Sequence, residues 1–171
     1  MDLAALIRDV PDFPTEGIVF KDITPLLADP RALDEAIDRL AEPYRDKGVQ
    51  VVTGVESRGF IFATAVARQL GAGFVPLRKP GKLPWKTIRK EYALEYGTDA
   101  MEVHADAVVP GARVLMIDDL LATGGTMAAA CELMKDLGAD IVGVGFLIEL
   151  CFLKGRDRLG GHDVYSLIRV P

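Results

Sequence analysis

The chain has 171 residues, half of them hydrophobic, which is enough for a single domain over residues 1–171 with one hydrophobic core. Its formal net charge of −5 makes it a poor candidate for nucleic-acid binding, which requires a basic surface. The N-terminus has no signal-peptide pattern and no apolar stretch is long enough to span a bilayer, so we expect a cytoplasmic protein without a membrane partner.

The hydrophobic pattern predicts strands and helices that alternate along the chain. In chain order we expect a helix (2–9), a segment punctuated by prolines (11–25), a helix (30–47), a strand (49–53), a helix (59–70), a strand (74–77), a strand (113–117), a helix (125–137) and a strand (141–147). Asp29 is expected as an N-cap, with Pro30 as the first helical residue. Because the strands are continuously apolar, the alternation indicates an α/β fold with a parallel β-sheet flanked by helices. Residues 78–107 break the pattern, and we expect a hairpin or a mobile excursion there.

The segment from Val114 to Thr126 carries the strongest chemical signal. An apolar strand ends in Asp118 and Asp119, and a turn of small residues then opens a helix. Backbone N–H groups of such a turn, the helix N-terminus and the hydroxyls of Thr123 and Thr126 form a cradle for phosphate. Carboxylates repel phosphate but bind sugar hydroxyls or Mg²⁺, so the pair beside the cradle points to a ribose phosphate. The alternative is a plain strand-to-helix turn with an aspartate cap, which needs only one carboxylate.

Basic residues are concentrated in one loop of this acidic chain. Six of its twenty lysines and arginines, and no acidic residue, lie within residues 78–90: Arg78, Lys79, Lys82, Lys86, Arg89 and Lys90. Such a loop suits a polyanionic ligand, although a solvated basic loop has the same composition. Arg58 follows an apolar strand and is expected at the same edge of the sheet. Neither G-x-G-x-x-G nor a P-loop occurs, which disfavours a dinucleotide dehydrogenase and a P-loop kinase.

Glu95 lies between aromatic and aliphatic residues in the segment 92–97. A glutamate in such surroundings can act as a general acid or base with a raised pKa if a lid closes over it. From composition alone, a solvent-facing position on a strand is the simpler interpretation.

Together, these segments resemble the adenine phosphoribosyltransferase family, a branch of the type I phosphoribosyltransferases. The resemblance spans almost the whole chain and rests on residues 11–27, 56–62, 78–84, 94–97, 118–126 and 149–156. It implies the type I phosphoribosyltransferase fold with a small N-terminal hood segment and a flexible lid loop. The implied reaction transfers 5-phosphoribosyl from phosphoribosyl pyrophosphate (PRPP) to N9 of adenine, giving AMP and pyrophosphate in purine salvage. The resemblance further implies a homodimer, and Mg²⁺ bound mainly through PRPP rather than at a protein metal site.

The resemblance also assigns roles by position. The 5-phosphate is expected at Ala122, Thr123, Gly124, Gly125 and Thr126. The ribose hydroxyls are expected at Asp118 and Asp119, which also favour positive charge at the anomeric carbon. Pyrophosphate is expected at Arg58, Arg78, Lys79 and Lys82, with Glu56 and Ser57 in a turn that the family builds on a non-proline cis peptide. The adenine pocket is expected at Val19, Phe20, Lys21 and Leu120. Glu95 is expected as the proton-transfer residue on the lid, with Tyr96 beside it, which reverses the interpretation from composition.

Two alternatives stay open at this point. The first is a phosphoribosyltransferase for another purine base, against which the segment Val19–Lys21 argues, since oxopurine enzymes build the base pocket differently. The second is a non-enzymatic PRPP-sensing regulator on the same fold. A regulator would normally carry an added DNA-binding module, and no helix-turn-helix pattern occurs among the 48 or so residues before the first core strand.

Overall fold

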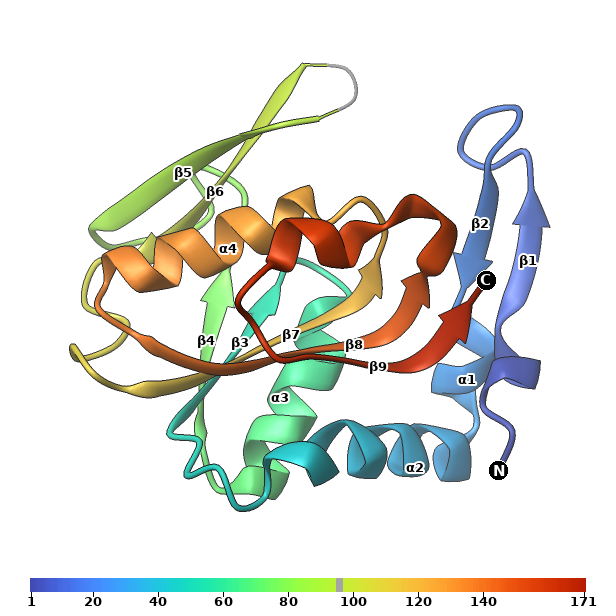
Figure 1. The fold of residues 1–171 in the computed structure, drawn as a ribbon, viewed down its shortest axis with the longest axis horizontal. Helices are drawn as coiled ribbons and strands as arrows, with labels where there is room; N and C mark the ends of the chain where they lie inside the picture. The colour runs from blue at the N-terminus through green and yellow to red at the C-terminus, as the bar shows by residue number, and fades with distance from the viewer. Residues whose placement is uncertain (95–96) are drawn as a thin grey trace.

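A five-stranded parallel sheet forms the centre of the molecule (Figure 1). The structure is a computed structural model that describes residues 1–94 and 97–171. The strands are β3 (Val51–Val55), β4 (Gly73–Leu77), β7 (Arg113–Leu121), β8 (Asp140–Leu150) and β9 (Val164–Val170). They are arranged in the order β4-β3-β7-β8-β9, and every neighbouring pair is parallel. The connections run in opposite directions from β3 and β7, and ligands of such sheets bind at this switch point, beyond the carboxyl ends of the strands.

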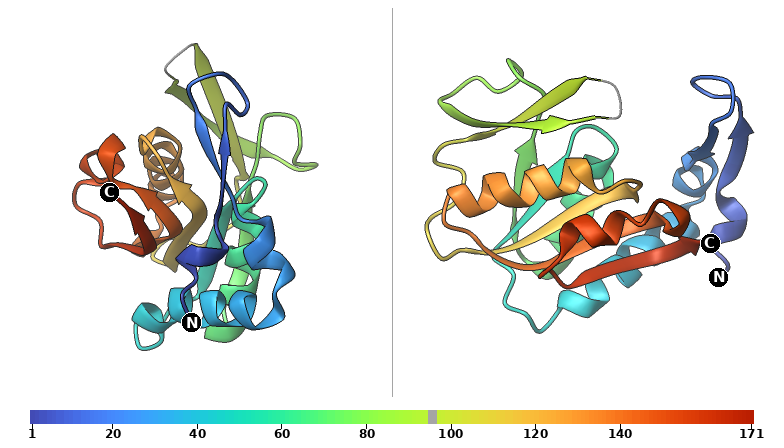
Figure 2. Two further views of the ribbon diagram at one scale, coloured as in Figure 1. Left: turned by 90° about the vertical axis from the view of Figure 1, so that its right-hand side faces the viewer. Right: turned by 45° about the horizontal axis from the view of Figure 1, so that its top comes forward.

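Helices cover both faces of the sheet, as the sequence predicts. α2 (Pro30–Ala41) and α3 (Gly59–Leu70) lie on one face, and α4 (Gly125–Asp136) lies on the other (Figures 1 and 2). The remaining helical segments are α1 (Thr24–Ala28) and the short 3₁₀ helices η1 (Ala4–Leu6), η2 (Glu42–Tyr44), η3 (Cys151–Leu153) and η4 (Gly155–Leu159). Throughout the two described ranges, no helix combines the length and the hydrophobicity that crossing a membrane requires.

The helix predicted for 30–47 begins as expected but ends early. The Asp29 carboxylate accepts hydrogen bonds from the N–H groups of Arg31 and Ala32, so Asp29 is the predicted N-cap. The α-helix stops at Ala41 and continues as η2. Pro43 explains the difference, because its nitrogen has no hydrogen to donate to the preceding turn.

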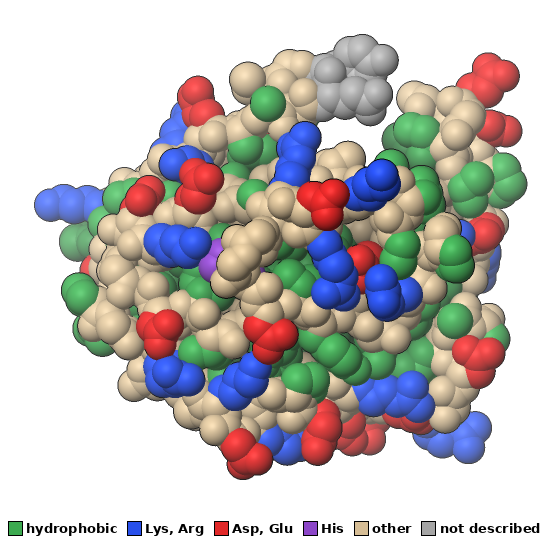
Figure 3. Space-filling model, viewed as in Figure 1, with side chains coloured by type: hydrophobic (Ala, Val, Ile, Leu, Met, Phe, Trp, Pro, Cys, Tyr) green, Lys and Arg blue, Asp and Glu red, His purple; other side chains and the backbone are tan. Residues whose placement is uncertain are grey.

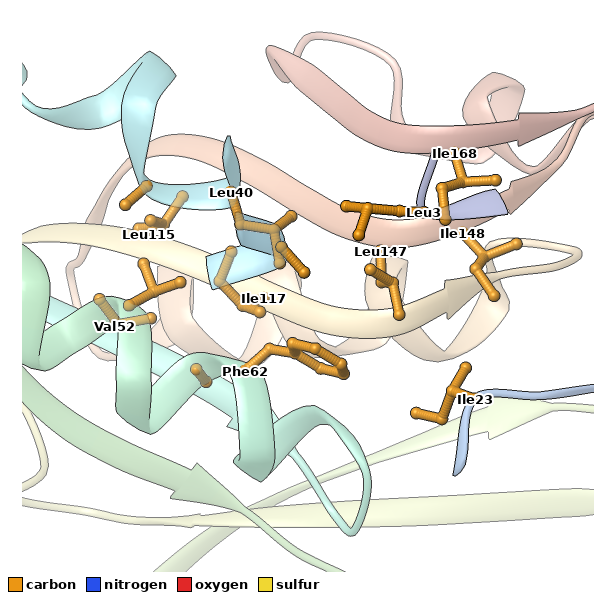
Figure 4. Close-up of a cluster of buried hydrophobic side chains, with 14 of the residues drawn as sticks. Leu3, Ile23, Leu40, Val52, Phe62, Leu115, Ile117, Leu147, Ile148 and Ile168 are labelled. Atoms are coloured by element: carbon orange, nitrogen blue, oxygen red, sulfur yellow. The ribbon is translucent and has the colours of Figure 1, made fainter. Parts of the chain in front are cut away.

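The main hydrophobic core lies between the sheet and the α2–α3 layer. In Figure 4, Leu40 of α2 and Phe62 of α3 point toward Ile117 of β7, and all three side chains are fully buried. A second cluster fills the space under α4 and the hairpin of β5 (Thr87–Ala93) and β6 (Thr98–His104), with Met116 and Phe146 among its buried members. The continuously apolar strands therefore bury both faces, which is why their sequences do not alternate.

Two antiparallel hairpins stand at the carboxyl edge of this sheet (Figure 1). The hood hairpin consists of β1 (Arg8–Pro11) and β2 (Val19–Asp22), and the lid hairpin of β5 (Thr87–Ala93) and β6 (Thr98–His104). The lid hairpin confirms the excursion predicted for 78–107. The helix predicted for 2–9 is wrong beyond η1, because the chain from Arg8 pairs with β2 and a cross-strand ion pair joins Lys21 Nζ to Asp9 at 2.6 Å.

In the central sheet, β3, β7 and β8 extend beyond their predicted ends, and β9 was not predicted. β7 is paired on both sides, and its ladder with β8 carries it through the two aspartates to Leu121. The aspartates therefore lie within the strand rather than after it. β9 forms the sheet edge beside β8, and its mixture of apolar and polar residues gave no strand signal in the sequence.

Candidate active site

A cleft of about 450 Å³ opens at the carboxyl ends of β3, β4 and β7, at the switch point of the sheet. Acidic and basic side chains gather over this end of the molecule, between the lid hairpin and the hood (Figure 3). The cleft walls include most of the residues assigned from the sequence: Glu56, Ser57, Arg58, Arg78, Lys79, Asp118, Asp119, Leu120, Ala122, Thr123, Gly124, Gly125 and Thr126. Segments that are up to 70 residues apart in the sequence thus meet in one place.

The turn between β7 and α4 is built from backbone and tightly packed from behind. Gly124 has a φ of +84°, and a Cβ there would lie 2.3 Å from the carbonyl oxygen of Gly155. A Cβ at Gly155 would lie 2.3 Å from the carbonyl oxygen of Ala122. Gly124 is also the N-cap residue of α4 and has no side chain to occupy the first N–H groups of the helix. Gly124, Gly125 and Thr126 line the cleft, so this helix N-terminus offers donors and a favourable field for an anion there.

The paired aspartates occupy different environments. The Asp119 side chain is buried and its Oδ2 accepts a hydrogen bond from Arg58 Nε at 2.5 Å. Asp118 Oδ1 accepts the Asp119 backbone N–H at 2.9 Å and lies against the start of α3, where a Cβ on Gly59 would be 2.7 Å away. Burial, followed by the charge of Asp119, raises the pKa of Asp118 well above its usual value. Hydroxyl donors or a cation that reach this carboxyl group would stabilise its charged form.

The opposite wall of the cleft is basic, but each cation has an acidic partner. The Glu56 carboxylate accepts the Lys79 backbone N–H at 2.7 Å and Arg78 Nη2 at 3.2 Å. Burial alone would raise the pKa of Glu56, but these hydrogen bonds and the Arg78 charge outweigh burial and lower it. The Glu56–Ser57 peptide bond is cis, as in the family that the sequence resembles. Arg78 Nη1 also donates to the carbonyl oxygen of Lys82 at 3.3 Å.

The hood contacts the cleft residue Arg58 through one aromatic side chain. The Arg58 guanidinium lies 5.2 Å from the centre of the Phe20 ring, and Phe13 packs edge-on against the same ring. Val19 is half exposed, and Lys21 is paired with Asp9. Within the ranges 1–94 and 97–171, the structure does not bring Val19, Phe20, Lys21 or Lys82 into the cleft walls. Leu120 does line the cleft, so one side of the expected base pocket is in place.

Several residues of the cleft were missed by the sequence analysis. The lid hairpin contributes Tyr92, Leu94, Asp99 and Met101. An apolar floor comes from Val55, Leu77, Leu121, Met127 and Phe146. Tyr92 and Asp99 are brought together by the register of the lid hairpin. This register depends on the length of the turn, which the sequence pattern does not predict. The two lid residues expected to act in proton transfer, Glu95 and Tyr96, lie outside the described residues.

A partly buried ion pair lies behind the turn between β7 and α4. The Glu149 side chain is 4% exposed and forms two hydrogen bonds of 2.7 Å with Arg156. Arg156 also donates to the carbonyl oxygen of Val164 and to Ser166 Oγ, at 2.7 and 3.3 Å. The Arg156 hydrogen bonds lower the pKa of Glu149 and outweigh the opposing effect of burial. This network fixes η4, and with it the Gly155 carbonyl that contacts Gly124.

The cleft offers oxygen ligands of the kind that Mg²⁺ shares with the phosphates of a substrate. Among the described residues, no group of three or more histidine, cysteine, aspartate or glutamate side chains is placed to hold a metal. Mg²⁺ prefers oxygen ligands and usually shares them between one or two carboxylates and substrate phosphates. Asp118, Asp119 and Glu56 offer such carboxylates beside a phosphate-sized cradle, so the residues fit Mg²⁺ that enters on a phosphorylated substrate.

A comparison with known protein families identifies the class of protein to which the chain belongs. The family model of the phosphoribosyl transferase domain matches residues 23–160. This range includes the sheet strands β3, β4, β7 and β8 and the turn between β7 and α4. The match covers most of the chain, which therefore belongs to the class of phosphoribosyltransferases.

The relatives narrow this class further. The chain is 59% identical to adenine phosphoribosyltransferase of Solibacter usitatus, over 98% of this chain and 97% of that one, and 56% identical to the Roseiflexus sp. enzyme of the same name over 98% of each. The crystal structure of adenine phosphoribosyltransferase from Thermoanaerobacter pseudethanolicus superposes with a TM-score of 0.96 at 49% identity, covering 99% of this chain and 98% of that one. The Saccharomyces cerevisiae enzyme, solved in complex with adenine and an imino-altritol bisphosphate, has a TM-score of 0.92 at 40% identity, with 97% and 96% covered. The chain belongs to the adenine phosphoribosyltransferase family, which confirms the resemblance and the fold expected from the sequence.

Proposed function

We propose that this protein transfers the 5-phosphoribosyl group of PRPP to N9 of adenine and releases AMP and pyrophosphate, as a step of purine salvage. One observation carries the proposal: a phosphate cradle, a carboxylate pair and a basic wall meet within one cleft of about 450 Å³. The high identity to adenine phosphoribosyltransferases over almost the whole chain supports the choice of substrates.

The proposed pose of PRPP follows from charge. Its 5-phosphate takes the cradle of residues 122–126, where backbone N–H groups and the α4 N-terminus attract an anion. Its ribose hydroxyls donate to Asp118 and Asp119, which lie directly before the cradle on β7. Its pyrophosphate faces Arg78 and Lys79 on the opposite wall, with Lys82 beside Arg78.

The proposed chemistry depends mainly on electrostatics. As pyrophosphate leaves, the anomeric carbon acquires positive charge, which the two aspartates stabilise from a partly buried position. Arg58, Arg78 and Lys79 stabilise the negative charge that develops on the leaving group. Mg²⁺, when bound with PRPP, neutralises further charge on the pyrophosphate.

The base is proposed to bind between the β7 edge and the hood. Leu120 provides one apolar wall, and Phe20, held against Arg58, provides the other, with Val19 and Lys21 beside it. The lid hairpin excludes water from the reacting carbon, which protects PRPP from hydrolysis. From the resemblance, we retain Glu95 as the residue that accepts the proton released when N9 reacts, with Tyr96 next to it.

We also propose a homodimer in the cytoplasm. Phe13, Ile18 and Val19 on the hood and Phe152 in η3 expose large apolar side chains, and hydrophobic groups gather over the hood strands in Figure 3. A second copy of the chain would cover such a surface. The two cysteines are free thiols, which suits a reducing compartment. Sedimentation at micromolar concentration tests the dimer.

An assay of four bases tests the function. Purified protein with Mg²⁺ and PRPP is expected to convert adenine to AMP, and to act far more slowly on hypoxanthine, guanine and xanthine. The discrimination arises because a reversed hydrogen bond at the amino edge of the base leaves buried polar groups unpaired. Equal rates on all four bases, or a preference for an oxopurine, would contradict the assignment of adenine as the preferred substrate. Binding of PRPP without turnover of any base would favour the regulator instead.

A further inference from the structure

Three cleft residues from three separate segments form one polar cluster. Lys79 follows β4, Tyr92 lies near the end of β5, and Asp99 lies near the start of β6. The Lys79 ammonium group is paired with Asp99 Oδ2, and the Tyr92 hydroxyl donates to the same oxygen at 3.2 Å. All three side chains line the cleft. The pair thus links the lid hairpin to the wall on which the proposed pyrophosphate site lies.

The ion pair is accessible enough to exchange partners. The Lys79 side chain is 45% exposed and the Asp99 side chain is 28% exposed, so water can replace either partner at little cost. An ammonium group carries three donors and tolerates several geometries, unlike a guanidinium fork. A pyrophosphate with several negative charges therefore competes well against one carboxylate for this ammonium group.

The lid hairpin does not depend on this pair for its attachment. The Arg78 N–H donates to the Glu102 carbonyl at 3.0 Å, and the Glu102 N–H donates back to the Arg78 carbonyl at 2.7 Å. The Glu102 side chain also accepts the Gly81 N–H at 3.2 Å. These bonds hold the base of the hairpin on β4 whether or not the Lys79–Asp99 pair is formed. Burial alone would lower the pKa of Lys79, but Asp99 outweighs it, which keeps the ammonium group charged.

We propose that Asp99 is a positioning residue that holds Lys79 in the cleft when pyrophosphate is absent and gives it up when pyrophosphate binds. Asp99 thus acts as an internal competitor of the pyrophosphate group, and it weakens the binding of both PRPP and the pyrophosphate product. Tyr92 fixes the carboxylate toward Lys79 by its hydrogen bond. This proposal rests on the proposed function, since it takes the Lys79 wall as the pyrophosphate site.

Direct binding of inorganic pyrophosphate with Mg²⁺, measured by titration calorimetry, tests the role of Asp99. Asp99→Asn is expected to bind pyrophosphate about fivefold more tightly than the wild type, the size expected for removing a competing half-exposed ion pair. The KM for PRPP is expected to fall by a similar factor, while the KM for adenine stays unchanged. Glu102→Gln is the matched control, since it removes one negative charge from the same strand without touching Lys79. It is expected to leave pyrophosphate binding unchanged.

A double-mutant cycle separates competition for Lys79 from a general effect of charge. In the background of Lys79→Met, adding Asp99→Asn is expected to change pyrophosphate affinity less than twofold, because no ammonium group is left to compete for. Unchanged or weaker binding by Asp99→Asn in a protein that melts at the wild-type temperature overturns the inference and leaves the proposed function intact. An equal gain from Glu102→Gln or in the Lys79→Met background also overturns it. Wild-type protein that converts adenine to AMP slowly or not at all, and does not bind pyrophosphate, overturns both.

Discussion

Replacing Gly124 by alanine is expected to disable the phosphate cradle while leaving the fold in place. Two separate effects act at this position. The φ of +84° strains any residue with a Cβ, and the new Cβ lies 2.3 Å from the Gly155 carbonyl oxygen. The backbone fixes the position of the Cβ, and the Gly155 oxygen is itself a backbone atom held by η4 and the Glu149–Arg156 pair, so neither side can yield by turning a side chain.

The strained φ lowers the stability of the protein, whereas the Cβ contact displaces the turn. Positive φ costs an L-residue about 1–2 kcal/mol, and the less flexible unfolded chain offsets roughly 0.4–1 kcal/mol of this. Relieving the contact requires a displacement of about 1 Å to reach ordinary van der Waals distance, which moves the N–H groups that face the phosphate. A misplacement of this size in a positioning element lowers kcat/KM for PRPP about 100-fold, or about 2.7 kcal/mol of transition-state stabilisation.

Gly111→Ala is the matched control for this prediction. Gly111 has a φ of +85°, and a Cβ there would have nothing within 4 Å, so it carries the strain without the contact. Steady-state kinetics with varied PRPP and urea unfolding should be run on both variants. We expect both to lose roughly 1 kcal/mol of stability from the strained φ, and only Gly124→Ala to lose activity. Wild-type kcat/KM in Gly124→Ala, or an equal loss of activity in Gly111→Ala, would refute the role of backbone packing at the turn.

Three further predictions concern buried ionisable groups. Asp118→Asn should lower kcat/KM for PRPP about 100-fold. It should also raise the free energy of unfolding at neutral pH, because burial and the neighbouring Asp119 raise the pKa of this carboxyl and disfavour its charge. Steady-state kinetics and urea unfolding check the two effects, and a loss of both activity and stability would contradict the electrostatic explanation. Glu149→Gln should cost about 1–3 kcal/mol of stability. Because the folded pKa of Glu149 lies below its ordinary value of 4.5, this contribution is complete above that pH and is lost as the pH falls through the lower folded pKa. The free energies of unfolding of the wild type and Glu149→Gln should therefore converge as the pH is lowered from 7 to 3. A difference that stays constant over this range would contradict a stabilising ion pair. Burial raises the pKa of the Cys131 thiol to about 12, so a thiol reagent at neutral pH should label the more accessible Cys151 and reach Cys131 only after unfolding; fast labelling of both would show that α4 opens readily.

Local signals in the sequence were sufficient for the layers of the fold and for the turn that is proposed as the phosphate cradle. The helix predicted at 59–70 agrees with α3, and the N-cap at Asp29 is present, because both depend on neighbours within a few residues. The cradle also lies within one short segment, from the end of β7 to the start of α4. In such cases the residues that are close in space are also close in the sequence, so the sequence alone predicts their arrangement.

Features that depend on pairing between distant segments were not predictable in this way. The first strand of the hood resembles an amphipathic helix until β2 pairs with it, and β9 becomes a strand only because β8 offers an edge. Asp99 has no motif of its own and enters the cleft through the register of the lid hairpin. The Gly124–Gly155 contact joins residues 31 positions apart, and the sequence contains no trace of it beyond the two glycines.

The charge of the cleft resolves an apparent conflict in this acidic chain, which carries a net charge of −5 and yet is proposed to bind a polyanion. Each cation of the cleft wall has a carboxylate partner: Arg58 with Asp119, Arg78 with Glu56 and Lys79 with Asp99. Before the substrate enters, the cleft is therefore close to neutral, and it does not form the open basic surface that attracts nucleic acid without specificity. In the proposed binding mode, a phosphorylated sugar exchanges these partners: carboxylates that leave their cations become acceptors for ribose hydroxyls, and the released cations take up the phosphates. The same acidic residues that lower the net charge thus make the site selective for a ligand that carries both groups at the right spacing.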